Sequence, residues 1–352
     1  RRWKEGRYCN ASINQFRQHP LDHFESLERV IKKLLQSGKM LPSQVKAISI
    51  DATGSSPIAV DRQGKPLVYQ AEFEDNPNAM VILWKDHTSI KEAEHINELA
   101  KKWGGVDFTT YSGGIYSSEW FWSKIYLFAK NDPAVDQAAW TWMEHCDLIT
   151  FDLIGGEDPE SFVRSRCAAG HKGMWHQSWG GYPPEVFFEA LHPSLSRIRK
   201  TLPNHTYSAD HPAGTLGKTW AEKLNLQEDT IVSVGILDAH ACALGAGIKE
   251  NVLVKVMGTS TCDMLGNRPE QLGNKVISGI SGQVDGSIIP NVIGFEAGQS
   301  AFGDVLAWFK NVISYPLQKL EGEAAQQLEE KLLQSLSDDA SQVPVNEGVL
   351  AM

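Results

Sequence analysis

The sequence is poor in three features that mark whole classes of protein. No apolar run approaches the roughly 18 residues that a membrane-spanning helix requires. Basic residues are outnumbered, because 33 Lys and Arg face 43 Asp and Glu and give a formal net charge of −10, which argues against a nucleic-acid-binding protein. Cysteine is scarce, and Cys9, Cys146, Cys167, Cys242 and Cys262 form no C-x-x-C pair. We therefore expect reduced thiols in a cytoplasmic protein without a membrane or nucleic-acid partner.

Two signatures of nucleotide and metal sites are also missing. No G-x-x-x-x-G-K-[ST] sequence occurs, so the chain has no Walker A phosphate loop. No H-E-x-x-H sequence or Cys/His spacing occurs either. We therefore expect no zinc site from His171, His176 and His240, assign no metal ligand, and interpret His240 as a packed histidine.

The composition that is present fits a large globular protein. Hydrophobic residues make up 42% and charged residues 22% of 352 residues, which is enough for two domains. The strand pattern restarts after Gly247, so we place the first domain at 1–247 and the second at 248–352. The chain begins at Arg1 rather than Met. We expect an interior piece of a longer polypeptide, with a truncated second domain.

Apolar periodicity and turn residues predict alternating helices and strands, typical of an α/β protein. The predicted helices cover residues 21–35, 89–103, 120–130, 134–145, 185–202, 216–224, 296–313 and 317–336. The predicted strands cover residues 45–50, 81–84, 231–237, 251–265, 275–284 and 287–294. Residues 58–60 and 67–69 flank a polar turn and are expected to form a hairpin.

The most informative segment is an apolar strand that ends at Asp238 and continues into a helix of small residues. A carboxylate at the carboxyl end of a strand lies where ligands bind in open α/β folds. Transfer of a phosphoryl group to an alcohol needs a proton acceptor beside the attacking hydroxyl, and a carboxylate can serve. The alternative is a helix N-cap, which also favours Asp.

A second apolar strand follows and stops at Gly258-Thr259-Ser260-Thr261. Backbone N–H groups of such a glycine and hydroxyl turn can hold a phosphate. The same residues could form a simple turn between strands. Its position directly after the Asp238 segment favours phosphoryl transfer to a small hydroxylated substrate.

Other polar residues are weaker candidates for substrate contacts. Lys172 could hold a sugar hydroxyl or a phosphate, although most lysines lie on the surface. Glu296 falls at a predicted helix start, where the helix dipole alone would favour a carboxylate. Residues 85–87 follow a strand end and could contact substrate or form a surface turn.

Several segments, in order, resemble the FGGY carbohydrate kinases, and within them the ribulokinase branch. These segments are Ile50-Asp51-Ala-Thr-Gly-Ser-Ser56, 76–80, Leu83-Trp-Lys-Asp-His-Thr88, Cys167-Ala-Ala-Gly-His-Lys172, Gly235-Ile-Leu-Asp238-Ala-His240-Ala241, Met257-Gly-Thr-Ser-Thr261 and Gly294-Phe-Glu-Ala-Gly-Gln299. The resemblance runs from residue 1 to about residue 316.

This resemblance implies two RNase H-like domains of the actin/Hsp70/sugar-kinase superfamily, facing each other across a cleft. It implies ATP- and Mg²⁺-dependent phosphorylation of L-ribulose at its 5-hydroxyl, in L-arabinose breakdown, and a homodimer is conceivable. By position, Asp238 matches the catalytic base, and Lys172, Asp238 and Glu296 match sugar contacts. Gly54 and Ser55 match a turn that approaches the sugar. Gly258, Thr259 and Ser260 match the second phosphate loop.

Two parts of the family pattern are absent. The first phosphate loop, a Gly-x-Asp-x-Gly-Thr hairpin, does not occur near the N-terminus, and the adenosine motif of the C-terminal half is missing. We therefore expect most of the sugar site, only half of the nucleotide site, and little or no activity from this chain alone. The alternatives are a kinase of another ketose such as D-ribulose, or a sugar-binding relative without catalysis. An actin-like filament fits least, because it has no use for the sugar-side segments.

Overall fold

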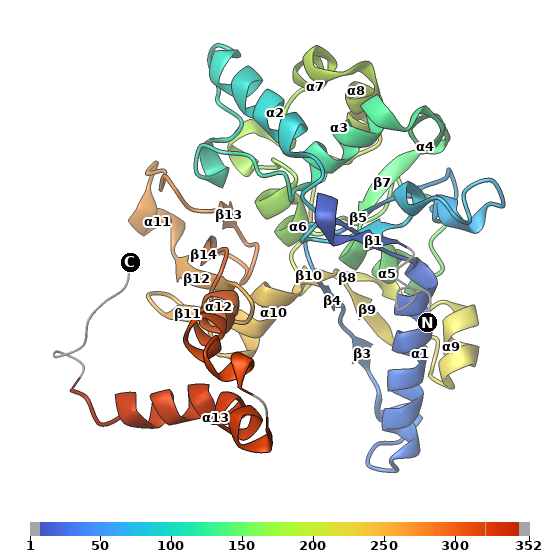
Figure 1. The fold of residues 1–352 in the computed structure, drawn as a ribbon. Coiled ribbons are helices and arrows are strands. Elements are labelled where there is room, and N and C mark those ends of the chain that lie inside the picture. Colours follow the sequence, from blue (N-terminus) through green and yellow to red (C-terminus); the bar gives the residue numbers. More distant parts are fainter. Residues whose placement is uncertain (1–7, 321, 345–352) are drawn as a thin grey trace. The chain divides into compact units, whose positions relative to one another are not determined.

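The computed structural model describes residues 8–320 and 322–344, and the chain divides into two compact units (Figure 1). The first unit holds the residues up to Val256 together with Asp263–Ala297. The second unit holds Met257–Cys262 and the residues from Gly298 onward. These compact units differ from the domains expected from the sequence, and a domain boundary at 247/248 remains a prediction.

Two parallel strand pairs bring distant segments of the first unit together. β3 (Ala47–Ile48) pairs with β9 (Ile231–Ser233). β4 (Asp51–Ala52) pairs with β10 (Ile236–Leu237), so that Leu237 lies opposite Ala52. Because these strands are parallel, the residues that follow β4 and β10 emerge at the same edge. This edge carries Asp238 and the turn at 53–56.

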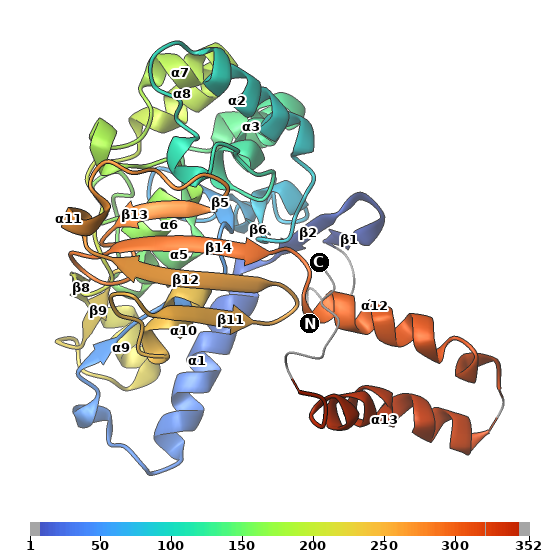
Figure 2. The ribbon, with the colours of Figure 1, turned by 90° about the vertical axis from the view of Figure 1, so that its left-hand side faces the viewer.

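One further strand extends the β3–β9 pair, and the remaining strands form three other groups. They are β8 (Pro212–Thr215) beside β9, β5 (Pro57–Val60) with β7 (Thr141–Glu144), the sheet β1 (Cys9–Asn10), β2 (Gln15–Gln18) and β6 (Val81–Ile82), and a four-stranded sheet. The four-stranded sheet has the order β11 (Leu253–Met257), β12 (Thr261–Asn267), β14 (Ile293–Gln299) and β13 (Gly282–Asp285), which can be followed in Figure 2. β13 and β14 are antiparallel.

The helices of the first unit surround these strands. They are α1 (Pro20–Gln36), α2 (Ile90–Lys102), α3 (Phe121–Asn131), α4 (Pro133–Ala138), α5 (His145–Leu153), α6 (Arg166–Lys172), α7 (Glu185–Leu191), α8 (Pro193–Lys200), α9 (Lys218–Leu224), α10 (Asp238–Gly245) and α11 (Pro269–Leu272). The second unit contains α12 (Gly303–Ser314) and α13 (Glu323–Ala340). Among the residues described, no helix is both long and apolar enough to cross a membrane.

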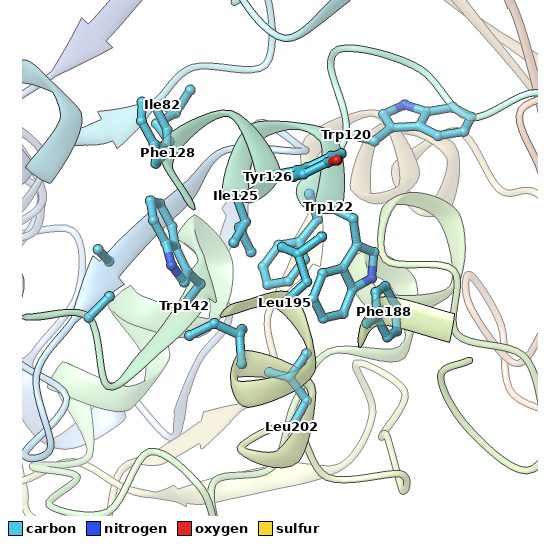
Figure 3. Close-up of a cluster of buried hydrophobic side chains, with 14 of the residues drawn as sticks. Ile82, Trp120, Trp122, Ile125, Tyr126, Phe128, Trp142, Phe188, Leu195 and Leu202 are labelled. Atoms are coloured by element: carbon cyan, nitrogen blue, oxygen red, sulfur yellow. The ribbon is translucent and has the colours of Figure 1, made fainter. Parts of the chain in front are cut away.

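The largest core cluster is aromatic and holds α3 against α7, α8 and β7 (Figure 3). Trp122 packs on Phe188 with ring centroids 3.9 Å apart, and Phe128 stacks on Trp142 at 5.6 Å. Large buried rings dominate core energetics, and such pairs add to the effect of burial itself. This core fixes α3, whose Lys124 reaches toward the candidate site.

Most predicted elements are present. Helices 21–35, 89–103 and 120–130 correspond to α1, α2 and α3, and the strand that ends before Asp238 corresponds to β10 and is followed by α10. His19 caps α1 by accepting a hydrogen bond from the Leu21 N–H, and Pro20 occupies the first turn. Both features are favourable helix starts.

Several predictions were wrong. The single strand 251–265 is instead the two strands β11 and β12, and most of the predicted strands 275–284 and 287–294 lies outside β13 and β14. The helix 134–145 is instead α4, strand β7 and the beginning of α5, because residues 141–144 pair with β5. The helix 185–202 is broken at Pro193, which follows an extended His192. Residues 67–69 form a 3₁₀ turn instead of the second strand of a hairpin. Glu296 lies within β14 opposite Gly282 and does not begin a helix, because α12 starts only at Gly303.

Candidate active site

Asp238 lies at the junction of β10 and α10, as the sequence predicted. The N-cap of α10 is Leu237, and Asp238 is the first helical residue. Its Oδ1 accepts a hydrogen bond from the N–H of the adjacent Ala239, with a nitrogen–oxygen distance of 2.7 Å. The carboxylate therefore does not make the bond of an N-cap to a later turn residue, and its exposed side chain is available to a ligand.

The surroundings of Asp238 favour a proton acceptor of raised basicity. Although the side chain reaches solvent, neighbouring protein atoms partly desolvate its carboxyl group and raise the pKa of that group. Repulsion from Asp51 adds to this effect, while Lys172 opposes it. A carboxylate with a raised pKa is a stronger base at neutral pH. Asp51, Lys172 and Glu296 all lie close enough to influence Asp238.

Lys172 and Glu296 form a buried ion pair. The Lys172 Nζ donates to Glu296 Oε1 at 2.6 Å, and the two residues are 6% exposed each. The Lys172 ammonium also lies 5.4 Å from the ring centroid of Trp120, within the range of a cation–π contact. Because Lys172 ends α6 and Glu296 lies in β14, the pair joins the helix to the four-stranded sheet.

The position of Lys172 is fixed by its own backbone. The Tyr116 hydroxyl donates to the Lys172 carbonyl at 2.5 Å, and the Trp122 indole N–H donates to the Gly173 carbonyl at 2.7 Å. These bonds satisfy carbonyls at the end of α6 that the helix itself leaves unpaired. Gly170 allows α6 to approach β13, because a Cβ there would lie 2.5 Å from a Val284 methyl carbon.

Two histidines complete the surroundings of Glu296. His171 Nδ1 and His240 Nε2 each lie 3.4 Å from Glu296 Oε2, and both rings are 1% exposed. Burial lowers the pKa of His171 well below its usual range and that of His240 to about 4, so both are neutral at pH 7. Burial alone would raise the pKa of Glu296, but the Lys172 ammonium lowers it to about 2. Glu296 is therefore an ionised hydrogen-bond acceptor.

The turn at Gly54 and Ser55 lies beside β10, but its serine points inward. A Cβ on Gly54 would lie 2.1 Å from a Leu237 methyl carbon, so the turn packs directly against the residue before Asp238. Ser55 is fully buried, and its hydroxyl donates to Glu144 Oε1. Gly54 is half-buried. A ligand contact from this turn is thus more accessible at Gly54 than at the Ser55 hydroxyl.

Two buried polar side chains that the sequence did not predict, Lys124 and Glu144, hold this turn. The Lys124 Nζ donates to the Ser55 carbonyl at 2.7 Å and to the Leu83 carbonyl at 2.9 Å. Glu144 Oε2 accepts from the Ser56 N–H at 2.8 Å. Burial lowers the pKa of Lys124 to about 7 and raises that of Glu144 to about 7.

Residues 85–87 have two different roles, because Asp86 is buried within the turn whereas Lys85 is exposed. Asp86 is fully buried, pairs with Arg17, and accepts a hydrogen bond from the Phe16 N–H at 2.6 Å. His87 Nε2 lies 3.3 Å from Glu119 Oε1, and the Lys85 Nζ lies 4.6 Å from the Phe16 ring centroid. Asp86 thus holds the turn together rather than facing a ligand.

The turn Gly258-Thr259-Ser260 belongs to the second unit and is tied to the start of α12. The Phe302 N–H donates to the Thr259 carbonyl at 2.8 Å, and the Gly303 N–H donates to the Gly258 carbonyl at 3.1 Å. Gly258 and Thr259 are exposed. A hydroxyl and an exposed backbone beside the N-terminus of a 12-residue helix fit a phosphate group.

Comparison with known proteins agrees with this arrangement. Residues 8–245 match the N-terminal domain of the FGGY family of carbohydrate kinases, and residues 253–350 match its C-terminal domain. A ribulokinase from Vibrio parahaemolyticus is 44% identical over 98% of this chain and 62% of its own length. A ribulokinase from Geobacillus thermodenitrificans is 38% identical over 83% of this chain and 50% of its own length.

Solved structures show the same fold. A xylulose kinase from Rhodospirillum rubrum aligns with a TM-score of 0.70 at 18% identity, over 94% of this chain and 59% of that one. A glycerol kinase from Plasmodium falciparum aligns with a TM-score of 0.65 at 16% identity, over 89% of this chain and 60% of that one. These similarities define the class of fold as that of the two-domain sugar kinases, and they confirm the predicted α/β architecture.

The chain belongs to the FGGY family of carbohydrate kinases. It spans 62% and 50% of the two ribulokinases described above.

Proposed function

We propose that this chain is part of a kinase that transfers the γ-phosphoryl group of ATP to the 5-hydroxyl of L-ribulose, giving L-ribulose 5-phosphate for L-arabinose breakdown. The observation that carries the proposal is the buried Lys172–Glu296 pair close to the exposed Asp238, in a chain that is 44% identical to a relative named ribulokinase. The five described cysteines form no disulfide, which supports a reducing, cytoplasmic setting.

Asp238 is proposed as the base. Its carboxylate accepts the proton of the sugar 5-hydroxyl while that oxygen forms a bond to the γ-phosphorus and the bond to the leaving ADP oxygen breaks. Phosphoryl transfer depends mainly on positioning and charge stabilisation, so one correctly placed proton acceptor is sufficient on the protein side. The raised pKa of Asp238 suits this role.

Lys172 and Glu296 are proposed as sugar contacts. Lys172 can donate to a sugar hydroxyl oxygen, and the ionised Glu296 can accept from a hydroxyl. The Trp120 ring beside Lys172 offers an apolar face to sugar C–H groups. Gly54 is proposed to approach the sugar through its backbone, with Ser55 holding the turn from inside.

Gly258, Thr259 and Ser260 are proposed to bind a phosphate of ATP through backbone N–H groups and hydroxyls. Mg²⁺, when bound with ATP, neutralises charge that develops on the phosphate oxygens. We assign no residue of this chain as its ligand. A homodimer remains a prediction, which light scattering can test.

The test is ADP release from MgATP, measured with different sugars by a coupled assay. The polypeptide should carry this sequence and span the full length of the Vibrio relative. We expect turnover with L-ribulose that exceeds turnover with D-ribulose and D-xylulose. Faster turnover with D-ribulose would identify D-ribulose as the preferred substrate in place of L-ribulose. If no ketopentose causes ADP release, the result would support a sugar-binding protein without catalysis.

A further inference from the structure

Two histidines converge on one carboxylate oxygen of Glu296, an arrangement that the proposed reaction does not explain. One ligand atom from each of His171, His240 and Glu296 lies within 4.8 Å of the other two, and all three residues are buried. They come from α6, α10 and β14, which are held together independently of any ligand. The three atoms therefore form a pre-arranged set of two nitrogens and one carboxylate oxygen.

The polar atoms of this set lack hydrogen bonds. His171 Nδ1, both ring nitrogens of His240 and Glu296 Oε2 are buried without a hydrogen-bond partner among the described residues. The 3.4 Å separations from Oε2 exceed the roughly 2.7–2.9 Å of a charge-assisted hydrogen bond. Buried polar atoms are normally satisfied, so three facing atoms that are not (His171 Nδ1, His240 Nε2 and Glu296 Oε2) call for an occupant.

The proton balance of His171 points to a positive occupant. The Ser287 hydroxyl donates to the Val284 carbonyl at 3.0 Å, so it can accept from the His171 Nε2–H, which lies 2.9 Å away. A neutral imidazole has one proton, and its Nδ1 then presents a lone pair. This lone pair faces the negatively charged Oε2 of Glu296, and a cation between the two atoms would remove the repulsion.

The spacing suits a small transition-metal ion. Zinc bonds to histidine nitrogen and carboxylate oxygen measure about 2.0–2.2 Å, which places tetrahedral ligands roughly 3.3 Å apart. The two nitrogen–oxygen separations are each 3.4 Å. The ligand atoms of the three residues lie within 4.8 Å of one another, so small ring rotations are enough to bring the two nitrogens to this tetrahedral spacing.

We propose that His171 Nδ1, His240 Nε2 and Glu296 Oε2 form a binding site for a divalent ion of the zinc class. Glu296 Oε1 stays with Lys172, and Ser287 orients the His171 ring from its other nitrogen, as groups behind metal ligands commonly do. The ammonium of Lys172 repels the ion and weakens its binding. This proposal does not depend on the kinase function.

This inference revises the expectation that these histidines form no zinc site. Sequence spacing finds ligands that share a helix or a loop, whereas these three residues lie far apart in the chain. Only the packing of α6 against β10 and β13 brings them together.

The test is a titration of the metal-free chain with Co²⁺, whose tetrahedral complexes absorb visible light strongly, followed by displacement with Zn²⁺. We expect one Co²⁺ per chain with a tetrahedral spectrum. His240→Gln and Glu296→Gln should each weaken binding at least tenfold, and Lys172→Met should strengthen it because a competing positive charge is removed. His205→Gln, which changes an exposed histidine, is the matched control and should bind normally.

Circular dichroism melting of each variant separates loss of a ligand from loss of the fold. If His240→Gln unfolds, the separately made Glu296→Gln and Lys172→Met variants still decide the question. The proposal is overturned if no tetrahedral spectrum develops in the native chain. Binding that is unchanged in folded His240→Gln and Glu296→Gln variants would overturn it as well.

Discussion

At the scale of single residues, Glu296 shows how surroundings set the state of a side chain. Burial disfavours its charge, yet the Lys172 ammonium lowers its pKa to about 2. Breaking a buried pair leaves one group buried without compensation, which costs far more than an exposed pair would. Lys172 and Glu296 should therefore act as one unit in both stability and sugar binding.

A double-mutant cycle tests whether Lys172 and Glu296 stabilise the protein as a coupled pair. Lys172→Met should destabilise the protein by about 3–5 kcal/mol, because Glu296 is left as a buried, uncompensated charge. The double variant Lys172→Met/Glu296→Gln should recover part of this loss. Urea unfolding followed by tryptophan fluorescence measures the free energies, and strictly additive effects would contradict the coupling.

The lowered pKa of Glu296 predicts that the free energy of unfolding depends on pH in the acidic range. The pKa of Glu296 falls from 4.5 in the unfolded chain to about 2 in the folded protein. Its stabilisation is therefore fully present above pH 4.5 and lost as the pH falls through about 2. Glu296→Gln should show a shallower loss of stability between pH 4.5 and 2 in urea unfolding. Parallel curves for the two proteins would show that Glu296 does not carry this proton linkage.

At the scale of elements, the turn after β4 is held by two buried polar side chains. Lys124 from α3 donates to the Ser55 carbonyl, and Glu144 from the end of β7 accepts from the Ser55 hydroxyl. The aromatic core fixes α3, and the β5–β7 pairing fixes Glu144. The position of the turn against Leu237 thus depends on elements remote from it in sequence.

Replacing Lys124 should disturb both the fold and the sugar site. Lys124→Met removes the donor to two buried backbone carbonyls, so we expect a loss of about 2–6 kcal/mol from two unsatisfied acceptors. In the full-length kinase, the KM for the sugar should rise more than kcat falls, because the turn is displaced rather than the base. Lys124→Met/Glu144→Gln should be more stable than Lys124→Met alone, and a fall in kcat at unchanged KM would contradict this positioning role.

At the scale of the whole molecule, features set by neighbouring residues in the sequence could be predicted, whereas contacts between distant segments could not. The junction at Asp238 was predictable because an apolar strand, an acid and a small-residue helix adjoin in sequence. The Lys124–Glu144 pair was not, because nothing near either residue indicates its partner. The sequence around Glu296 predicts a helix start, which is wrong. Glu296 lies in β14 because this segment pairs with β13, and that pairing cannot be recognised from the residues next to Glu296.

Cysteine reactivity tests the packing of the first unit as a whole. Cys242 is exposed, whereas Cys146 and Cys167 are buried and their pKa values are raised by desolvation. Titration with a chromogenic disulfide reagent should modify Cys242 rapidly in the native chain and leave Cys146 and Cys167 unmodified. All five cysteines should react after unfolding. Rapid native modification of Cys146 or Cys167 would show that the core is not packed as described.

The most direct measurement compares ADP release by the full-length kinase and its Asp238→Asn variant, with MgATP and saturating L-ribulose. The variant keeps the size of the side chain and loses its ability to accept a proton. We expect its kcat to fall roughly a thousandfold, the scale of losing an essential proton acceptor, with sugar binding by calorimetry retained. A variant that keeps the parent rate would contradict the assignment of Asp238 as the base and, with it, the proposed mechanism.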